Sequence, residues 1–98
     1  MKKETFFALM TMRILNLGFT ANQSLNPDMV CFENSKGNRI YMTLKENSID
    51  MNVMRISKTC YNPKIVSYSE SIIEEVASKI KTNLKLTHDI FKLNQTQS

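Results

Sequence analysis

The sequence predicts an α+β fold: an N-terminal helix, a three-stranded antiparallel β-meander and a long C-terminal amphipathic helix. Three observations lead to this prediction. Apolar residues recur at helical spacing near both ends of the chain, three short middle segments alternate between apolar and polar residues, and turn-forming residues separate those segments. The 98 residues are enough for one modest core. We therefore predict a single domain over residues 1–93 and a polar C-terminal tail over residues 94–98.

The first predicted helix runs from Lys3 to Leu17, a segment made largely of good helix formers. Gly18 follows it, where a left-handed C-cap residue is wanted. At roughly 100° per residue, five apolar side chains share one broad face: Phe6, Phe7, Met10, Ile14 and Leu17. The rest of the helix surface carries three more apolar residues, Ala8, Met12 and Leu15. This helix is therefore apolar nearly all round.

Thr20 to Asp28 is a polar segment that ends in Asn-Pro-Asp, and we predict a loop there. Met29 to Glu33 and Arg39 to Glu46 then alternate between apolar and polar residues, as strands covered on one face do. A third strand begins at Ile49. Its alternation fails at Met54-Arg55-Ile56, which indicates a β-bulge.

The predicted core of this sheet consists of the residues that alternate inward: Val30, Phe32, Ile40, Met42, Leu44, Ile49, Met51 and Val53. Ser57 to Tyr68 is ambiguous, because Lys64 to Tyr68 either adds a short fourth strand at the sheet edge or leads directly into the next helix. Pro63 argues against a central strand in this segment.

The second helix is predicted to start close to Ser71, because Ser71-Ile72-Ile73-Glu74 matches a capping box. Its apolar stripe extends from Ile72 to about Leu93 and can lie across the sheet. Glu74 and Glu75 fall in the first turn, where negative charge favours the helix dipole.

The net charge and the cysteine content of the chain limit its possible partners and its location in the cell. Thirteen Lys and Arg against nine Asp and Glu leave a formal charge of +4, which favours acidic partners. Cys31 and Cys60 have neither disulfide-framework nor zinc-site spacing, which favours a reduced, cytoplasmic location. Arg13 interrupts the apolar run near the N-terminus, so we expect no membrane insertion.

No motif in the sequence predicts catalysis. A nucleophile needs a nearby base held in place by a third group, whereas His88, the only histidine, stands between Lys85 and Lys92. The acidic residues lack metal-ligand spacing, and no glycine-rich phosphate loop is present. We therefore predict a protein that is not an enzyme and needs no cofactor.

Three surfaces are candidates for binding. Lys81, Lys85, His88 and Lys92 form a basic stripe on the second helix, which either contacts phosphates or an acidic partner or is a plain solvated face. Arg39, Tyr41 and Lys45 lie on the outer face of the sheet, where one aromatic residue is too few for a base-stacking platform. Ala8, Met12 and Leu15 form an apolar patch if the long connections leave the first helix uncovered.

These surfaces predict a small non-enzymatic interaction protein that forms a homodimer or docks on a protein partner through the first helix. In size and layout the chain is similar to compact inhibitors encoded by phages and mobile elements, including anti-CRISPR proteins. That similarity implies that it binds and blocks a host nucleic-acid-handling complex. The alternative is a dimeric nucleic-acid-binding protein that pairs two basic stripes, with affinity falling steeply as salt rises.

Overall fold

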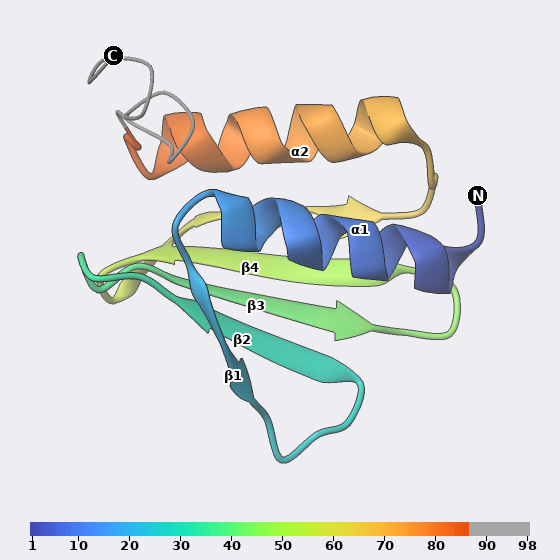
Figure 1. The fold of residues 1–98 in the computed structure, drawn as a ribbon, viewed down its shortest axis with the longest axis horizontal. Coiled ribbons are helices and arrows are strands. Elements are labelled where there is room, and N and C mark those ends of the chain that lie inside the picture. Colours follow the sequence, from blue (N-terminus) through green and yellow to red (C-terminus); the bar gives the residue numbers. More distant parts are fainter. Residues whose placement is uncertain (87–98) are drawn as a thin grey trace.

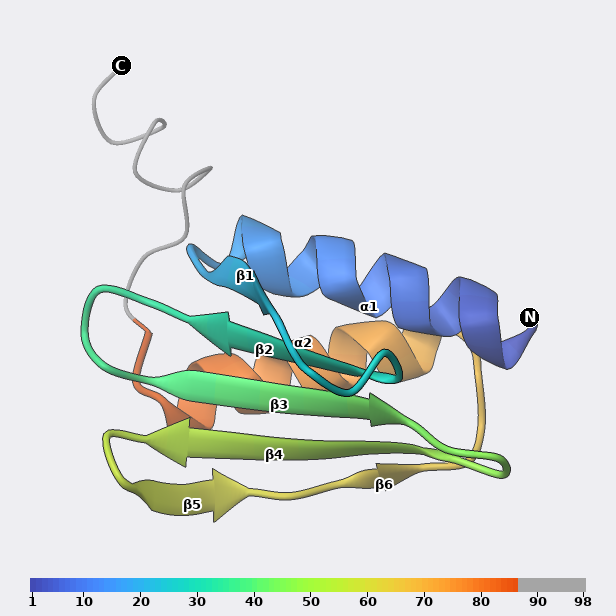
Figure 2. The same cartoon turned by 90° about the horizontal axis from the view of Figure 1, so that it is seen from below.

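Two helices lie on one face of a six-stranded antiparallel sheet in the computed structural model, which describes residues 1–86 (Figure 1). In chain order the elements are α1 (Lys3–Asn16), β1 (Thr20–Gln23), β2 (Met29–Glu33), β3 (Arg39–Leu44), β4 (Ile49–Arg55), β5 (Lys58–Tyr61), β6 (Lys64–Ile65) and α2 (Glu70–Asn83). Seen from the sheet side, both helices stand behind the strands, and no helix within residues 1–86 covers the opposite face of the sheet (Figure 2). The α+β class is confirmed, with more strands than the three predicted.

The strands follow one another across the sheet in the order β1-β2-β3-β4-β5, and β6 continues alongside β4 beyond the end of β5. Pro63 separates β5 from β6. Its carbonyl oxygen still accepts a hydrogen bond from the Met51 N–H at 3.1 Å, so the edge of β4 stays paired across the break. Proline is tolerated here because this is the edge of the sheet.

The central three strands form where alternation predicts them. β2 has the predicted bounds, and β3 ends at Leu44, two residues before the predicted Glu46. The bulge is confirmed as a register shift between Val53 and Met54, but the extra residue, Cys60, belongs to the partner strand β5. The Cys60 thiol donates to the Val53 carbonyl oxygen at 3.4 Å.

Two strands lie in segments that alternation did not identify. β1 occupies the beginning of the predicted loop Thr20 to Asp28, and β5 lies in the ambiguous segment Ser57 to Tyr68. Both are edge strands, and both carry mostly polar side chains. An edge strand is held by backbone hydrogen bonds to one neighbouring strand, so it does not need a row of inward apolar side chains. β6 confirms only the first two residues of the predicted edge strand.

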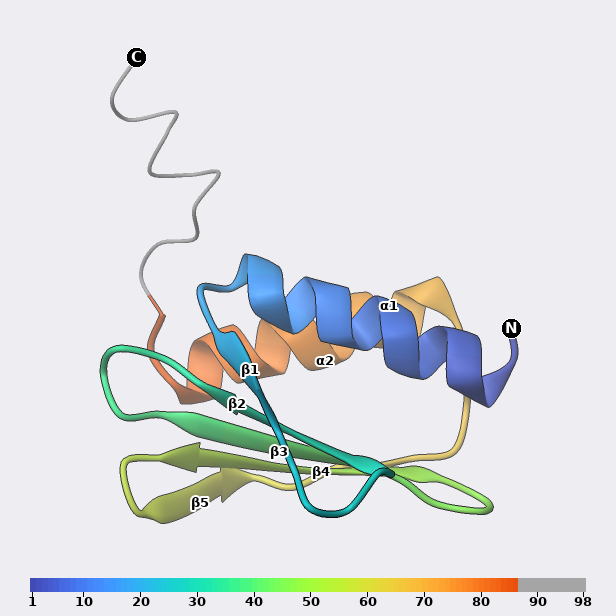
Figure 3. The ribbon, with the colours of Figure 1, turned by 60° about the horizontal axis from the view of Figure 1, so that its bottom comes forward.

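A single core joins both helices to the inner face of the sheet. α1 contributes Phe6, Met10 and Ile14, all fully buried, so the predicted inward face is confirmed. The inward sheet residues are also buried, except that Val30 and Leu44 are only partly covered. The remaining members follow α1, lie in β6, or come from α2 and its C-terminal end: Leu17, Phe19, Ile65, Ile73, Val76, Ala77, Ile80 and Leu84. The two helices run beside one another over this core (Figure 3).

The N-terminal boundary of α2 differs from the prediction by one half-turn. Ser69, and not Ser71, is the N-cap residue, and its hydroxyl oxygen accepts a hydrogen bond from the Ile72 N–H at 3.3 Å. The Ser71 hydroxyl instead contacts that of Ser69 at 3.0 Å. Starting at Ser69 brings Glu70 into the first turn, where its charge favours the helix dipole.

The C-terminal boundary corrects a larger error, since α2 ends at Asn83 and not near Leu93. The Leu86 N–H donates to the Lys81 carbonyl oxygen at 2.9 Å, and the Lys85 N–H donates to that of Thr82 at 3.2 Å. This is a Schellman motif, with Lys85 in the left-handed region at φ 54°. Leu86 then packs against the core. The prediction missed this end because a lysine holds the position that usually signals a stop with glycine.

We expect Lys85→Gly to stabilise the protein by up to about 1 kcal/mol, because glycine adopts positive φ without a steric penalty. The matched control is Lys79→Gly, which places glycine at an exposed position inside α2 and should cost about 1 kcal/mol. Thermal unfolding followed by circular dichroism measures both, with about 4–8 °C per kcal/mol for a domain of this size. Destabilisation by both variants would contradict the left-handed assignment.

Candidate functional site

The outward face of α1 is an exposed apolar surface directly opposite the core. It consists of Ala8, Leu9, Met12 and Leu15, which we call the apolar strip. Met12 is 60% exposed, and Leu9 and Leu15 are 36% and 38% exposed. The connections therefore leave all three predicted residues uncovered within residues 1–86. Leu9 was missed, although its helical angle places it beside Met12.

A hollow of about 260 Å³ borders the apolar strip where α1 meets the start of α2. Its lining residues are Leu9, Met12, Arg13, Asn16, Glu70, Ile73 and Glu74. Arg13 donates to both carboxylate oxygens of Glu74, at 2.7 and 2.8 Å. The Arg13 side chain is 38% exposed and that of Glu74 is 61% exposed, so this partly solvated pair contributes at most about 1 kcal/mol to stability. Its effect on the surface is to neutralise the rim beside the strip.

Two residues of the predicted basic stripe, Lys81 and Lys85, lie in the part of the chain that the structure describes. Lys81 lies in α2, but Lys85 follows its end in the left-handed conformation, so the angular projection fails between them. His88 and Lys92 lie outside the described residues. Lys81 and Lys85 therefore do not share one face of α2, because the Schellman motif turns the chain at Lys85, and the stripe of four residues stays a prediction.

The fold instead gathers cations at one end of the molecule. The β2–β3 turn, the β4–β5 turn and the C-terminal end of α2 all lie at this end (Figure 2). They carry Lys36, Arg39, Arg55, Lys58 and Lys85, which we call the basic end. All five residues are exposed. The sequence could not show this grouping, because its members come from three separate segments.

The outer sheet face brings two of its three predicted residues together. Arg39 and Tyr41 project from the same side of β3, and a hydrogen bond to the Tyr41 side chain raises the pKa of Arg39, with the nearby Glu33 charge adding to the effect. Lys45 lies beyond the other end of β3, where its ammonium is 3.9 Å from an Asp50 carboxylate oxygen. The cross-strand row through Tyr41 is otherwise polar or small: Asn22, Cys31 and Asn52.

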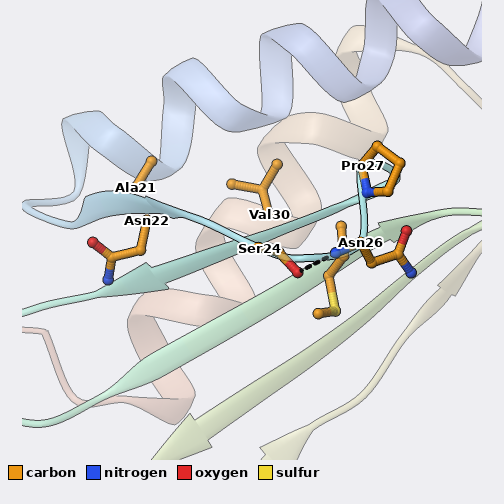
Figure 4. Close-up of a pocket in the computed structure, with 7 residues that line it drawn as sticks. Ala21, Asn22, Ser24, Asn26, Pro27 and Val30 are labelled. Carbon is orange, nitrogen blue, oxygen red and sulfur yellow. Dashed lines mark hydrogen bonds between the residues drawn. The ribbon is translucent and has the colours of Figure 1, made fainter.

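A hollow of about 360 Å³ lies near the β1–β2 connection (Figure 4). In this view Ala21 and Val30 point toward α1, whereas Asn22 points away from it. The Ser24 hydroxyl accepts a hydrogen bond from the Asn26 N–H at 3.1 Å. The lining residues carry no ionisable side chain, so this hollow can offer hydrogen bonds but no acid–base chemistry.

Tyr61 borders another hollow, of about 230 Å³, between the β5–β6 edge and α2. Burial raises the pKa of its phenol, and the negative charge of Glu75 raises it further. The residues that line this hollow include one acid, Glu75, and no histidine. Tyr61 is therefore a packing residue at the sheet edge in our interpretation.

Within residues 1–86 no group of three or more His, Cys, Asp or Glu side chains could hold a metal ion. None of the described helices has the length and apolar character needed to cross a membrane. Both cysteines are free thiols. Comparison with known proteins finds no matching family model, no matching curated protein and no matching solved structure.

The raised pKa of Tyr61 predicts that stability falls as the pH rises above the ordinary tyrosine value of 10.0. The folded state holds the phenolic proton more tightly than the unfolded state, so this contribution is lost through and above that pH. Subtracting the phenolate absorbance titration of Tyr61→Phe from that of the unmodified protein isolates this residue. Glu75→Gln should lower the midpoint of the difference curve, and a midpoint at or below 10.0 would contradict the assignment.

Proposed function

We propose that this protein is a non-enzymatic interaction protein that acts as a homodimer through the apolar strip of α1. One observation carries the proposal: Ala8, Met12 and Leu15 are exposed on a helix whose opposite side already fills the core. An exposed apolar patch on a small domain usually marks an interface, because burying it removes apolar surface from water.

A second copy of the chain is the occupant that fits the strip best. In an antiparallel α1–α1 pair centred near Met10, Ala8 of each copy faces Met12 of the other, and Thr5 faces Leu15. A small side chain then lies opposite a large one at both positions. Such reciprocal contacts are what a two-fold interface requires.

The charge distribution also favours the antiparallel arrangement. The apolar strip carries no charged residue, and Arg13 at its border is neutralised by Glu74. The basic end lies at the C-terminal end of α1 (Figure 2). Antiparallel pairing therefore places the two basic ends far apart, whereas parallel pairing would bring both sets of cations together.

The strip is short, which sets the expected affinity. α1 has 14 residues and is about 21 Å long at the usual helical rise. Interfaces built on such a surface fall at the low end of specific contacts, about 1,200 Å² or less in total. We therefore expect a dimer that dissociates in the micromolar range.

Met12→Asp and Leu15→Asp should each convert the dimer into a monomer, because either change buries a charge in the paired strip. Light scattering coupled to size-exclusion chromatography over a micromolar concentration series measures the mass. The matched control is Leu25→Asp, the same change at a fully exposed leucine in the β1–β2 connection. A monomeric unmodified protein throughout the series, or equal dissociation by the control, would refute dimerisation through the strip.

Mixing two variants tests the register of the pair. Ala8→Lys and Met12→Asp should each weaken self-association, because each homodimer contains two altered contacts. A mixed dimer contains one ion pair, between the introduced lysine and the introduced aspartate, and one unaltered contact between Met12 and Ala8. We therefore expect the mixture to associate more strongly than either variant alone, whereas a parallel or shifted pairing gives no such rescue.

The dimer would act by binding a target through its remaining surface. By analogy in size and layout with phage and mobile-element inhibitors, we propose that this target is a macromolecule. Nucleic-acid binding by two paired helical stripes receives less support, because α2 ends at Asn83. The cations of the basic end favour a contact made largely by the turns of the sheet.

A further inference from the structure

The turn between β4 and β5 adopts a conformation that its sequence disfavours. Arg55 pairs with Lys58, so Ile56 and Ser57 form a two-residue hairpin turn. Ile56 has φ 61°, a value that the first position of such turns normally reserves for glycine. A β-branched residue is strained at positive φ. Ile56 is also 68% exposed, so little packing offsets the strain.

The residues on either side of this turn, Arg55 and Lys58, form a second arrangement that is unfavourable in a β-sheet. Arg55 and Lys58 are directly opposed across the hairpin, and like charges in this position destabilise a sheet. Both side chains are exposed, and within residues 1–86 neither forms an ion pair. A strained apolar residue thus projects between two repelling cations. Departures from local sequence preference concentrate at functional sites.

Neighbouring cations extend this charge across the end of the sheet. Arg39 begins β3, where it is paired with Met54, the residue before Arg55, on one side and with Glu33 of β2 on the other. The β2–β3 turn that carries Lys36 is held in shape by the Asn34 side-chain oxygen, which accepts hydrogen bonds from the Lys36 and Asn38 N–H groups at 3.1 and 3.0 Å. The cations are therefore presented by ordered backbone at successive strands, which lie about 4.8 Å apart.

We propose that the β4–β5 turn is a nucleic-acid contact site, in which Arg55 and Lys58 bind backbone phosphates and Ile56 contacts the bases. Arg39 and Lys36 continue the phosphate contact along the basic end. A nucleic acid fits this surface better than an acidic protein does, because its phosphates form a continuous line that matches cations spaced across adjacent strands. An exposed isoleucine between cations matches the apolar residues that proteins insert against bases.

This site is independent of the dimer, because no residue of the basic end belongs to the apolar strip. Met12→Asp should abolish dimerisation and leave the intrinsic contact of each hairpin unchanged. Failure of the dimer proposal therefore leaves this proposal standing, and the reverse also holds.

Fluorescence anisotropy of labelled single-stranded DNA, single-stranded RNA and duplex DNA tests the site over a salt series. Four phosphate contacts predict a slope of about −3.6 in log affinity against log salt for duplex and about −2.8 for single strands. The double variant Arg55→Ala with Lys58→Ala should flatten the slope by about 1.8 for duplex or about 1.4 for single strands. The three probes identify which form of nucleic acid is bound.

The matched control is Lys2→Ala with Lys64→Ala, which removes the same charge from exposed residues at the other end of the molecule. This control should retain the affinity and the slope of the unmodified protein. Equal losses in both double variants would show that net charge alone is responsible and would overturn the site. Absence of binding to all three probes at low salt, or stronger binding to a poly-glutamate peptide, would also overturn it.

Ile56→Gly separates contact from folding. Glycine relieves the strained φ, so the variant should unfold at a higher temperature than the unmodified protein. Its affinity should fall about fivefold, the amount expected for burying roughly half of an isoleucine side chain. The salt slope should stay unchanged because no charge is removed. A more stable variant with undiminished affinity would refute the role of Ile56.

Discussion

The covering of one sheet face by two helices is the constraint on which the rest of this structure depends. The inner rows of β2, β3 and β4 are fully apolar, and α1 and α2 bury them together in a single core. Neither helix is wide enough to cover these rows alone, since an α-helix is about 10 Å across. Both helices therefore pack on the same face of the sheet. The outer sheet face and the far side of α1 are left to solvent as a result.

Antiparallel topology then decides where charge accumulates. In a meander every second turn returns to the same end of the sheet, so the β2–β3 and β4–β5 turns lie together (Figure 3). α2 also ends there, because it runs back over the core from the β6 side. The cations of these three segments, which are far apart in the sequence, therefore lie together on one surface, the basic end. The opposite end carries both signs of charge: Glu4, Asp28, Glu46 and Glu70 lie there together with Lys2, Lys3, Lys45 and Lys64.

The same end carries both non-glycine residues of the described chain that have positive φ, Ile56 and Lys85. Each stands where glycine would be the unstrained choice: one turns a hairpin and the other ends a helix. Both are exposed, and both place a side chain that glycine lacks on the basic end. Strain and charge therefore coincide on one surface, while the apolar strip lies on a regular, unstrained helix.

The sequence by itself determined α1, its inward and outward faces, and the three central strands, because periodic burial leaves its period in the residues. The edge strands β1 and β5, the end of α2 at a lysine and the shared location of five cations were decided only by tertiary structure. Edge strands need backbone partners and no apolar row, and a Schellman motif can form on any residue that tolerates positive φ. Proximity between distant segments depends on topology, which local periodicity does not encode.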